Sequence, residues 1–303
     1  MPTQQIDMND VNSATFDSNT VNAIYLNSTK IWEVAQPIIA YATAQSGVTY
    51  TAVSDLSSYT DAQINAISKA ISNCQDITLN TQTVYLSDET SISVGATRSV
   101  TLSTQEVITN RILGFNHDTL SSSTAYGSTT ATGKAGITWD MVNCLLYTTY
   151  PMNDTATNLG GWNVCKMRTT ILPTIKATLP QSLQNIIKTV NKLTANGGKT
   201  NYTAIVTSQD DLFLISEREL YGMQTYAKEG DSEGEMYKYW AIHTQNSDKI
   251  KQYIYNNQLT DTQWWQRSSY MYDDARFTCT YVAGNPGYIS AEKNRGTSFL
   301  YCT

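Results

Sequence analysis

The segment 264–303 has apolar ends and a polar, turn-rich middle, and this pattern limits how the C-terminal part of the chain can fold. It begins with the run WWQRSS at residues 264–269 and ends with the run FLYC at residues 299–302. Between them, residues 270–294 are rich in Tyr, Asn, Asp and Arg. Tyrosine offers a large contact area at low entropy cost, and Asn and Ser offer adaptable hydrogen bonds. We therefore expect the apolar runs to form a buried scaffold that holds the middle as a contact surface.

The composition predicts a largely uncharged polar surface. Charged residues make up 15% of the 303 residues, below the roughly 25% of typical soluble domains. The hydrophobic content of 41% is sufficient for a core. The net charge is −6 and no basic run occurs, which argues against a nucleic-acid partner.

The targeting signals of secreted and membrane proteins are not apparent. No stretch reaches 18 apolar residues, so no membrane insertion is expected. The first residues lack a basic region followed by an apolar one, which argues against a secretory signal peptide. We expect synthesis and folding in a cytoplasm, with any release by lysis or another route.

The cysteines do not indicate a disulfide framework. Their number is odd and no C-x-x-C motif occurs. We expect buried thiols that act as small apolar residues, with a Cys279–Cys302 bridge between neighbouring strands as the alternative.

Glycine usage indicates two parts of the chain. Of 16 glycines, only Gly47 precedes Gly95, so we place a boundary near residue 90, between an N-terminal arm (1–90) and a C-terminal domain (91–303). Residues 21–32 predict two short strands around a turn. A lone hairpin is marginal in water, so we expect it to pack against another chain. A capping box at residues 60–63 predicts a helix over 61–74.

The remaining sequence predicts an α+β order of elements. Apolar spacing from Leu183 to Leu193 predicts the longest helix within 172–195, and a capping box at Ser216 and Glu219 predicts a short helix. We expect an exposed loop at 118–136. Strands are expected at 83–86, 92–94, 99–102, 107–115, 204–206 and 212–215, and again after residue 264.

Residue types that support catalysis or metal binding are sparse. The two histidines, His117 and His243, have no metal-ligand spacing around them, and no phosphate-binding, dinucleotide-binding or nucleophile-elbow motif occurs. The acidic stretch 228–235 lacks the spacing of a calcium loop, so a solvated loop is expected, with calcium binding as the alternative. We expect no metal, no cofactor and no catalytic residue.

Aromatic residues give the strongest positive signal, with 20 tyrosines in the chain. Exposed aromatic side chains stack on sugars or anchor protein contacts. The alternative is that these rings fill an irregular core. Arg267 is expected to be a buried or semi-buried tie that bonds loop carbonyls. The candidate ligand-binding residues are Tyr270, Tyr272, Asp273, Asp274, Arg276, Asn285, Tyr288, Glu292 and Asn294. The candidate structural core residues are Trp162, Arg168, Trp264, Trp265, Arg267 and Phe299.

Several ordered motifs over roughly residues 92–303 carry a resemblance. These are ILGFNHD at 112–118, GGW at 160–162 with KMR at 166–168 and two later LP pairs, DLFLISERE at 211–219, WWQRS at 264–268 and FLYC at 299–302. Together they resemble a domain family of unknown function found in prophage and gut-bacterial proteins. Residues 93–96 depart from it, because the family usually has an acidic residue after the glycine.

The resemblance implies a C-type-lectin-like fold, similar to phage receptor-binding proteins and to the variable proteins of diversity-generating elements. The hairpin at 21–32 resembles one of phage tail proteins, with Ser28 in place of glycine. This implies a virion tail fibre or tail-tip protein, a homo-oligomer (a trimer by analogy), whose arm docks to other tail or baseplate proteins. Motifs of calcium-dependent sugar binding are absent.

Three functions follow as expectations. The first is a receptor-binding adhesin for a host cell-surface protein or glycan. The second is a structural tail or baseplate protein without a host ligand. The third is an oxidase-like enzyme, because the same superfamily includes formylglycine-generating enzymes, and it would use Cys279 or Cys302.

Overall fold

The computed structural model describes residues 37–200, 204–227 and 233–303, together with four short strands nearer the N-terminus. The chain divides into two compact units, Met1–Ile38 and Ile39–Thr303. In the first unit, β1 (Ala14–Phe16) pairs with β2 (Asn19–Val21), and β3 (Ala23–Leu26) pairs with β4 (Thr29–Glu33), both antiparallel. The β3–β4 pair agrees with the hairpin predicted at 21–32, whose turn lies outside the described residues.

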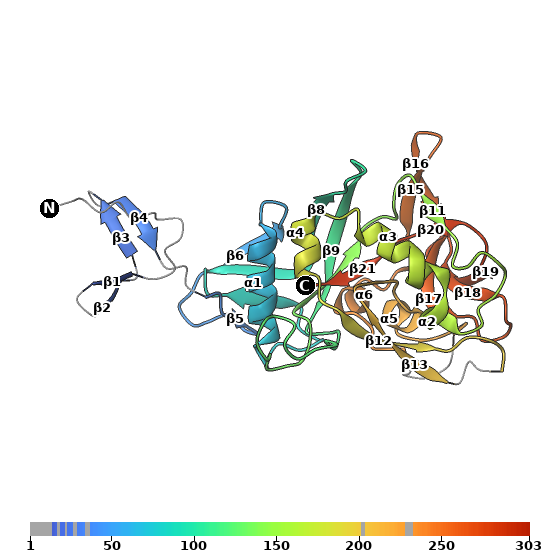
Figure 1. Cartoon of the computed structure of the whole chain (residues 1–303), viewed down its shortest axis with the longest axis horizontal. Coiled ribbons are helices and arrows are strands. Elements are labelled where there is room, and N and C mark those ends of the chain that lie inside the picture. The colour runs from blue at the N-terminus through green and yellow to red at the C-terminus, as the bar shows by residue number, and fades with distance from the viewer. Residues whose placement is uncertain are drawn as a thin grey trace. The chain divides into compact units, whose positions relative to one another are not determined.

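The larger sheet of the second unit has eight strands in the described chain (Figure 1). Its order is β14-β21-β10-β9-β8-β7-β5, and β6 pairs with β8 in parallel, whereas the other pairs are antiparallel. The strands are β5 (Ala40–Tyr41), β6 (Thr51–Asp55), β7 (Thr83–Leu86), β8 (Thr90–Thr101), β9 (Val107–Phe115), β10 (Ile137–Met141), β14 (Leu212–Phe213) and β21 (Leu300–Cys302).

This sheet crosses the boundary that glycine usage suggested. Strands β5, β6 and β7 precede residue 90, yet they pair within the sheet that β8 and β9 continue. The compact unit therefore begins at Ile39 in the structure, because these three strands are hydrogen-bonded into its larger sheet. The predicted strands at 92–94 and 99–102 form a single strand, β8, which passes through Gly95 at a φ of 90°.

Helix α1 (Asp61–Ser72) confirms the predicted capping box. The Thr60 side chain accepts a hydrogen bond from the amide of Gln63, and the Gln63 side-chain oxygen accepts one from the amide of Thr60. The helix buries its isoleucines, Ile64, Ile67 and Ile71. The backbone of α1 lies so close to Gly136 that a Cβ at that residue would lie 1.9 Å from the carbonyl oxygen of Ser68. Only glycine fits at that position.

A second sheet carries the Tyr-rich C-terminal segment. Its order is β11-β20-β17-β18-β19, with β17 and β20 parallel and the other pairs antiparallel. The strands are β11 (Thr149–Tyr150), β17 (Trp264–Ser269), β18 (Arg276–Thr280), β19 (Pro286–Ser290) and β20 (Arg295–Gly296). Two further antiparallel pairs are β12 (Val190–Ala195) with β13 (Ile205–Asp210), and β15 (Lys251–Tyr255) with β16 (Gln258–Thr262).

The long helix predicted within 172–195 is wrong. A π-helical turn, η1 (Met167–Ile171), leads into α3 (Leu172–Lys176), then α4 (Gln181–Ile186) follows, and the chain continues as strand β12. Pro180 separates the two helices because its ring disfavours helical backbone in the preceding residue. The apolar spacing from 183 to 193 runs across the end of α4 and into β12. In β12, Val190, Lys192 and Thr194 are buried, whereas the residues between them are not.

Short helices and loops complete the second unit. They are α2 (Gly161–Val164), α5 (Glu217–Tyr221), α6 (Lys238–Ile242) and the 3₁₀ turn η2 (Asn246–Lys249). The capping box at Ser216 and Glu219 is confirmed at the start of α5. The 118–136 segment is mainly irregular, and most of its residues are exposed or half-buried, as predicted, but Leu120, Tyr126 and Ala135 are buried.

The described chain is therefore an α+β protein with mostly antiparallel sheets, as predicted. None of the helices in the described residues is both long and apolar enough to cross a membrane. The five cysteines are free, and all but Cys74 are buried. The alternative Cys279–Cys302 bridge is absent, because Cys279 lies in β18 and Cys302 lies in β21, which belong to different sheets.

Candidate functional site: a tyrosine surface on a buried ionic brace

The predicted scaffold residues are buried with one exception. Trp162, Trp264, Trp265 and Phe299 are fully buried. Arg168 is not a core residue: its side chain is 22% exposed and pairs with the Asp210 carboxylate at the end of β13. The apolar ends of segment 264–303 therefore form the scaffold that the sequence indicated.

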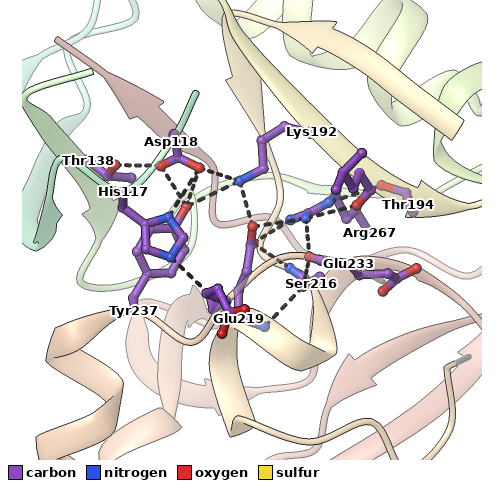
Figure 2. Close-up of polar contacts among 12 residues, drawn as sticks. His117, Asp118, Thr138, Lys192, Thr194, Ser216, Glu219, Glu233, Tyr237 and Arg267 are labelled. Carbon is purple, nitrogen blue, oxygen red and sulfur yellow. Dashed lines mark hydrogen bonds and ion pairs between the residues drawn. The ribbon is translucent and has the colours of Figure 1, made fainter. Parts of the chain in front are cut away.

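Arg267 is fully buried and ties three segments together, as predicted (Figure 2). The β17–β18 pairing is irregular between Trp265 and Ser269. The Arg267 guanidinium donates to the carbonyl oxygens of Leu214 (3.0 Å) and Glu233 (2.9 Å) and to the Glu219 carboxylate (2.9 Å). A buried arginine needs such partners, because an unpaired buried charge is costly.

The ion pairs extend from Arg267 to the segment after β9 (Figure 2). Lys192 of β12 lies between two carboxylates, at 2.6 Å from Asp118 and 2.6 Å from Glu219. The Tyr237 hydroxyl donates to Asp118 (3.0 Å), and the His117 ring stacks on Tyr237 at 3.9 Å. We call Asp118, Lys192, Glu219 and Arg267 the ionic brace.

The electrostatics of the ionic brace keep its carboxylates charged. Burial alone raises the pKa of Asp118, but the Lys192 ammonium and His117 hold that pKa well below its usual range. Burial is likewise outweighed at Glu219, where Arg267 and then Lys192 lower the pKa. All four side chains are buried, so the ionic brace holds segments together and offers no contact surface.

The acidic stretch 228–235 is only partly described. Residues 228–232 lie outside the described residues. Glu233 is fully buried, where its carboxylate accepts from the amide of Ala195 (2.8 Å) and from the Ser268 hydroxyl. The expectation of a solvated loop is therefore wrong at Glu233, because the carboxylate closes the polar contacts around Arg267. Burial raises its pKa.

Several of the predicted contact residues of segment 270–288 gather around a set of tyrosine rings. Tyr270 and Tyr288 stack with centroids 4.1 Å apart, and Tyr272 meets Tyr270 edge-on at 5.5 Å. Tyr226 joins them, with its ring 4.9 Å from that of Tyr288. Tyr272 is 57% exposed, whereas the other three rings are half-buried.

Charged side chains border these rings. The Arg276 guanidinium lies over Tyr288 at 5.1 Å and over Tyr270 at 5.7 Å. It also pairs with Asp273 at 3.1 Å, and both side chains remain partly exposed. We define the tyrosine surface as Tyr226, Tyr270, Tyr272, Asp273, Arg276 and Tyr288.

The other predicted contact residues lie around or away from the tyrosine surface. Asp274 is exposed and accepts from the amide of Lys199 at 2.5 Å. Glu292 pairs with Lys293 (3.1 Å) just beyond β19. Arg276 pairs with Ser290 at the end of β19, whereas Asn285 lies just before the start of that strand. Its side-chain oxygen accepts a hydrogen bond from the side-chain amide of Asn246 at 2.6 Å. Asn294 lies in the turn before β20 and is exposed.

A buried asparagine that sequence reasoning missed pins the loop of the tyrosine surface. The Asn158 side-chain amide donates to the carbonyl oxygens of Tyr270 (3.1 Å), Asp273 (2.9 Å) and Arg276 (2.7 Å). Asn158 is itself fully buried. One side chain therefore fixes the backbone at both ends and in the middle of the 270–276 loop. In the sequence, Asn158 stands two positions before the glycine pair of GGW, and nothing local marks it as buried.

Glu217 pins the segment that carries Tyr226. Its buried carboxylate accepts from the amides of Tyr226 (3.0 Å) and Ala227 (2.8 Å). The carbonyl of Tyr226 in turn accepts from the amide of Met271 at 3.0 Å. Burial raises the pKa of Glu217 to about 7, although these amide hydrogen bonds oppose the shift. The sequence does not reveal this link, because 226 and 270 are distant along the chain.

Metal-ligand clusters are not a feature of the described residues, which contain no group of three or more His, Cys, Asp or Glu that could hold a metal ion. The two cysteines of the enzyme alternative, Cys279 and Cys302, are both buried. Burial raises the pKa of Cys279 to about 12 and that of Cys302 well above its usual value.

Comparison with known proteins gives one match. No curated protein and no solved structure matches the chain. A family model described as "Domain of unknown function (DUF6273)" matches residues 132–297, which is more than half of the chain. The match includes the tyrosine surface and, apart from Asp118, the ionic brace. The chain therefore belongs to the DUF6273 family.

Proposed function

We propose that this protein is a host-attachment protein, whose second unit presents the tyrosine surface to a ligand on a cell surface. The observation that carries the proposal is the convergence of Tyr270, Tyr272, Asp273, Arg276 and Tyr288 on one partly exposed surface. Exposed tyrosine and arginine side chains are the residue types that dominate binding energy at contact surfaces.

The mechanism is noncovalent and depends on a surface that is ordered before the ligand arrives. Asn158 fixes the 270–276 loop and Glu217 fixes the segment at Tyr226, so little loop entropy is lost on binding. Stacking, hydrogen bonding and charge pairing then supply the attraction. Several copies on one particle multiply a weak single-site affinity.

The finer parts of the proposal come from the resemblance described above. They are a C-type-lectin-like fold for the second unit, a place in a phage tail, docking to other tail proteins through the β3–β4 hairpin, and a homotrimeric assembly. The neutral, polar composition of the chain is compatible with such a place.

Binding of the labelled full-length protein to a panel of gut-bacterial strains tests the proposal. We expect saturable binding to at least one strain. We expect the triple variant Tyr270→Ala, Tyr272→Ala, Tyr288→Ala to lose it at least tenfold, because the rings supply the contact area. The matched control is Tyr255→Ala, a tyrosine of β15 that is 56% exposed. Equal binding by the triple variant and the control would show that the tyrosine surface does not contribute to attachment.

The two alternative functions predict different results. A structural tail protein without a ligand would bind none of the strains. The oxidase-like alternative needs reactive thiolates, and the raised pKa values of Cys279 and Cys302 give no support for them. We expect iodoacetamide to leave both thiols unmodified in the folded protein and to modify them after denaturation, as mass spectrometry of peptides would report. Rapid alkylation of either in the folded state would favour the oxidase.

A further inference from the structure

We propose that the tyrosine surface binds a neutral hexopyranose unit of a cell-surface polysaccharide, with one face of the sugar stacked on the Tyr272 ring. This inference rests on the proposed function and names the class of ligand. It follows from the exposure of a single ring, from the pairing of the charges beside it, and from the small apolar area available.

Tyr272 is the ring that offers a free face. Tyr270 and Tyr288 stack on each other, and Tyr226 packs edge-on against Tyr288. These three rings therefore cover part of one another's surface. Tyr272 instead meets Tyr270 edge-on and keeps 57% of its surface exposed. A flat apolar ring held in place matches the C–H groups on one face of a pyranose, and its hydroxyl remains free to bond water or ligand.

The border of the surface supplies both kinds of hydrogen-bonding group that sugar hydroxyls need. The Asp273 side chain is 31% exposed and accepts hydrogen bonds, and the Arg276 side chain is 41% exposed and donates them. Because the two are paired at 3.1 Å, an acceptor and a donor lie side by side. A hydroxyl group, which is both donor and acceptor, can bond to such a pair.

Charge balance favours a neutral sugar over an acidic one. Arg276 is already paired with Asp273, and nearby Lys293 is paired with Glu292. Asp274 adds a further exposed carboxylate next to the pair. An anionic ligand would have to compete with these carboxylates for each cation, and like charges repel at short range. A sialic or uronic acid unit is therefore disfavoured.

The accessible apolar area fits one sugar unit better than a protein partner. Stable protein–protein interfaces bury about 800 Å² on each partner and are centred on several desolvated anchors. The tyrosine surface offers one ring that is more than half exposed. A polysaccharide repeats the same unit many times, so weak sites on several copies of the protein engage together.

Saturation-transfer NMR on the full-length protein tests the inference. The probes are methyl β-D-galactopyranoside, methyl β-D-glucopyranoside and methyl α-D-mannopyranoside, with N-acetylneuraminic acid as the acidic probe. We expect saturation of the ring C–H protons of at least one neutral glycoside and a weaker signal from the acid. Tyr272→Ala should reduce the affinity at least tenfold, Tyr272→Phe should retain most of it, and Tyr255→Ala should leave it unchanged.

Three results would overturn the inference: no transfer to any neutral glycoside, transfer that Tyr272→Ala leaves unchanged, or a stronger signal from the acid. The cell-binding experiment separates this failure from failure of the proposed function. Cell binding that depends on the tyrosine surface, without any glycoside signal, would identify a protein ligand and leave attachment standing. A Tyr272-dependent glycoside signal without cell binding would support the sugar site and contradict host attachment.

Discussion

At the scale of single residues, a few buried polar groups order the exposed tyrosine surface. Asn158 and Glu217 contact no solvent, yet they fix the backbone on which the tyrosines stand. Their burial could not be predicted from the sequence, because a polar residue two positions before a glycine pair or in a capping segment is usually exposed. The tyrosines themselves were predictable from their density in a turn-rich segment.

The loss of Asn158 should destabilise the protein and loosen the 270–276 loop. Asn158→Ala removes the side-chain donor from three carbonyl oxygens. That of Arg276 keeps the amide of Tyr270 as a donor, and each group left unsatisfied and buried costs about 1–3 kcal/mol. We expect the free energy of unfolding in urea to fall by about 2–4 kcal/mol. Asn246→Ala, which removes an exposed contact to Asn285, is the control and should cost under about 0.5 kcal/mol. Similar losses for both variants would contradict the role of Asn158.

Glu217 should make stability depend on pH. Its pKa of about 7 in the folded protein lies above the ordinary value of about 4.5 for a glutamate, so the folded state binds more protons between these values. Its contribution to stability is therefore present below about pH 4.5 and is lost as the pH rises to about 7, by about 3 kcal/mol in total. Glu217→Gln should flatten this part of the profile of unfolding free energy against pH. An unchanged slope in the variant would show that Glu217 does not titrate there.

At the scale of elements, local signals predicted helix starts and isolated strands well. The capping boxes at Thr60 and Ser216, the strand at 107–115 and the N-terminal strand pair all appear in the structure. The failure lies at 172–195, where one turn of helix and a strand share an apolar spacing. Only the contact of β12 with β13 decides between the two, and that pairing is not visible in a local window.

The N-cap of α1 should contribute measurably to stability. Thr60→Ala removes the side-chain acceptor for the amide of Gln63, and loss of such a cap costs about 1 kcal/mol. We expect a corresponding fall in the free energy of unfolding, measured by circular dichroism in urea. Thr104→Ala, in the exposed turn between β8 and β9, is the matched control. A cap variant as stable as the control would show that α1 is held by packing alone.

At the scale of the whole second unit, the ionic brace connects segments that are far apart in sequence. It joins residue 118, strand β12, helix α5 and strand β17. The sequence predicted that Arg267 would be a buried tie, but it did not predict its charged partners, because nothing local places Lys192 next to Asp118. The same limit hid Tyr226 from the tyrosine surface.

Removal of the central cation should be far more costly than removal of a surface one. Lys192→Ala leaves Asp118 and Glu219 as buried carboxylates without that partner, which costs about 3–5 kcal/mol. Lys293→Ala breaks an exposed pair with Glu292 and should cost under about 1 kcal/mol. Urea unfolding of both variants measures the difference. Equal losses would show that the ionic brace does not stabilise the fold.

We propose that the tyrosine surface attaches this protein to cells. The most direct measurement is the affinity of three full-length proteins, wild type, Tyr272→Ala and Tyr255→Ala, for one strain that the wild type binds. We expect Tyr255→Ala to bind as the wild type does, and Tyr272→Ala to bind at least tenfold more weakly. Equal affinity of Tyr272→Ala and Tyr255→Ala, with both proteins folded, would contradict it.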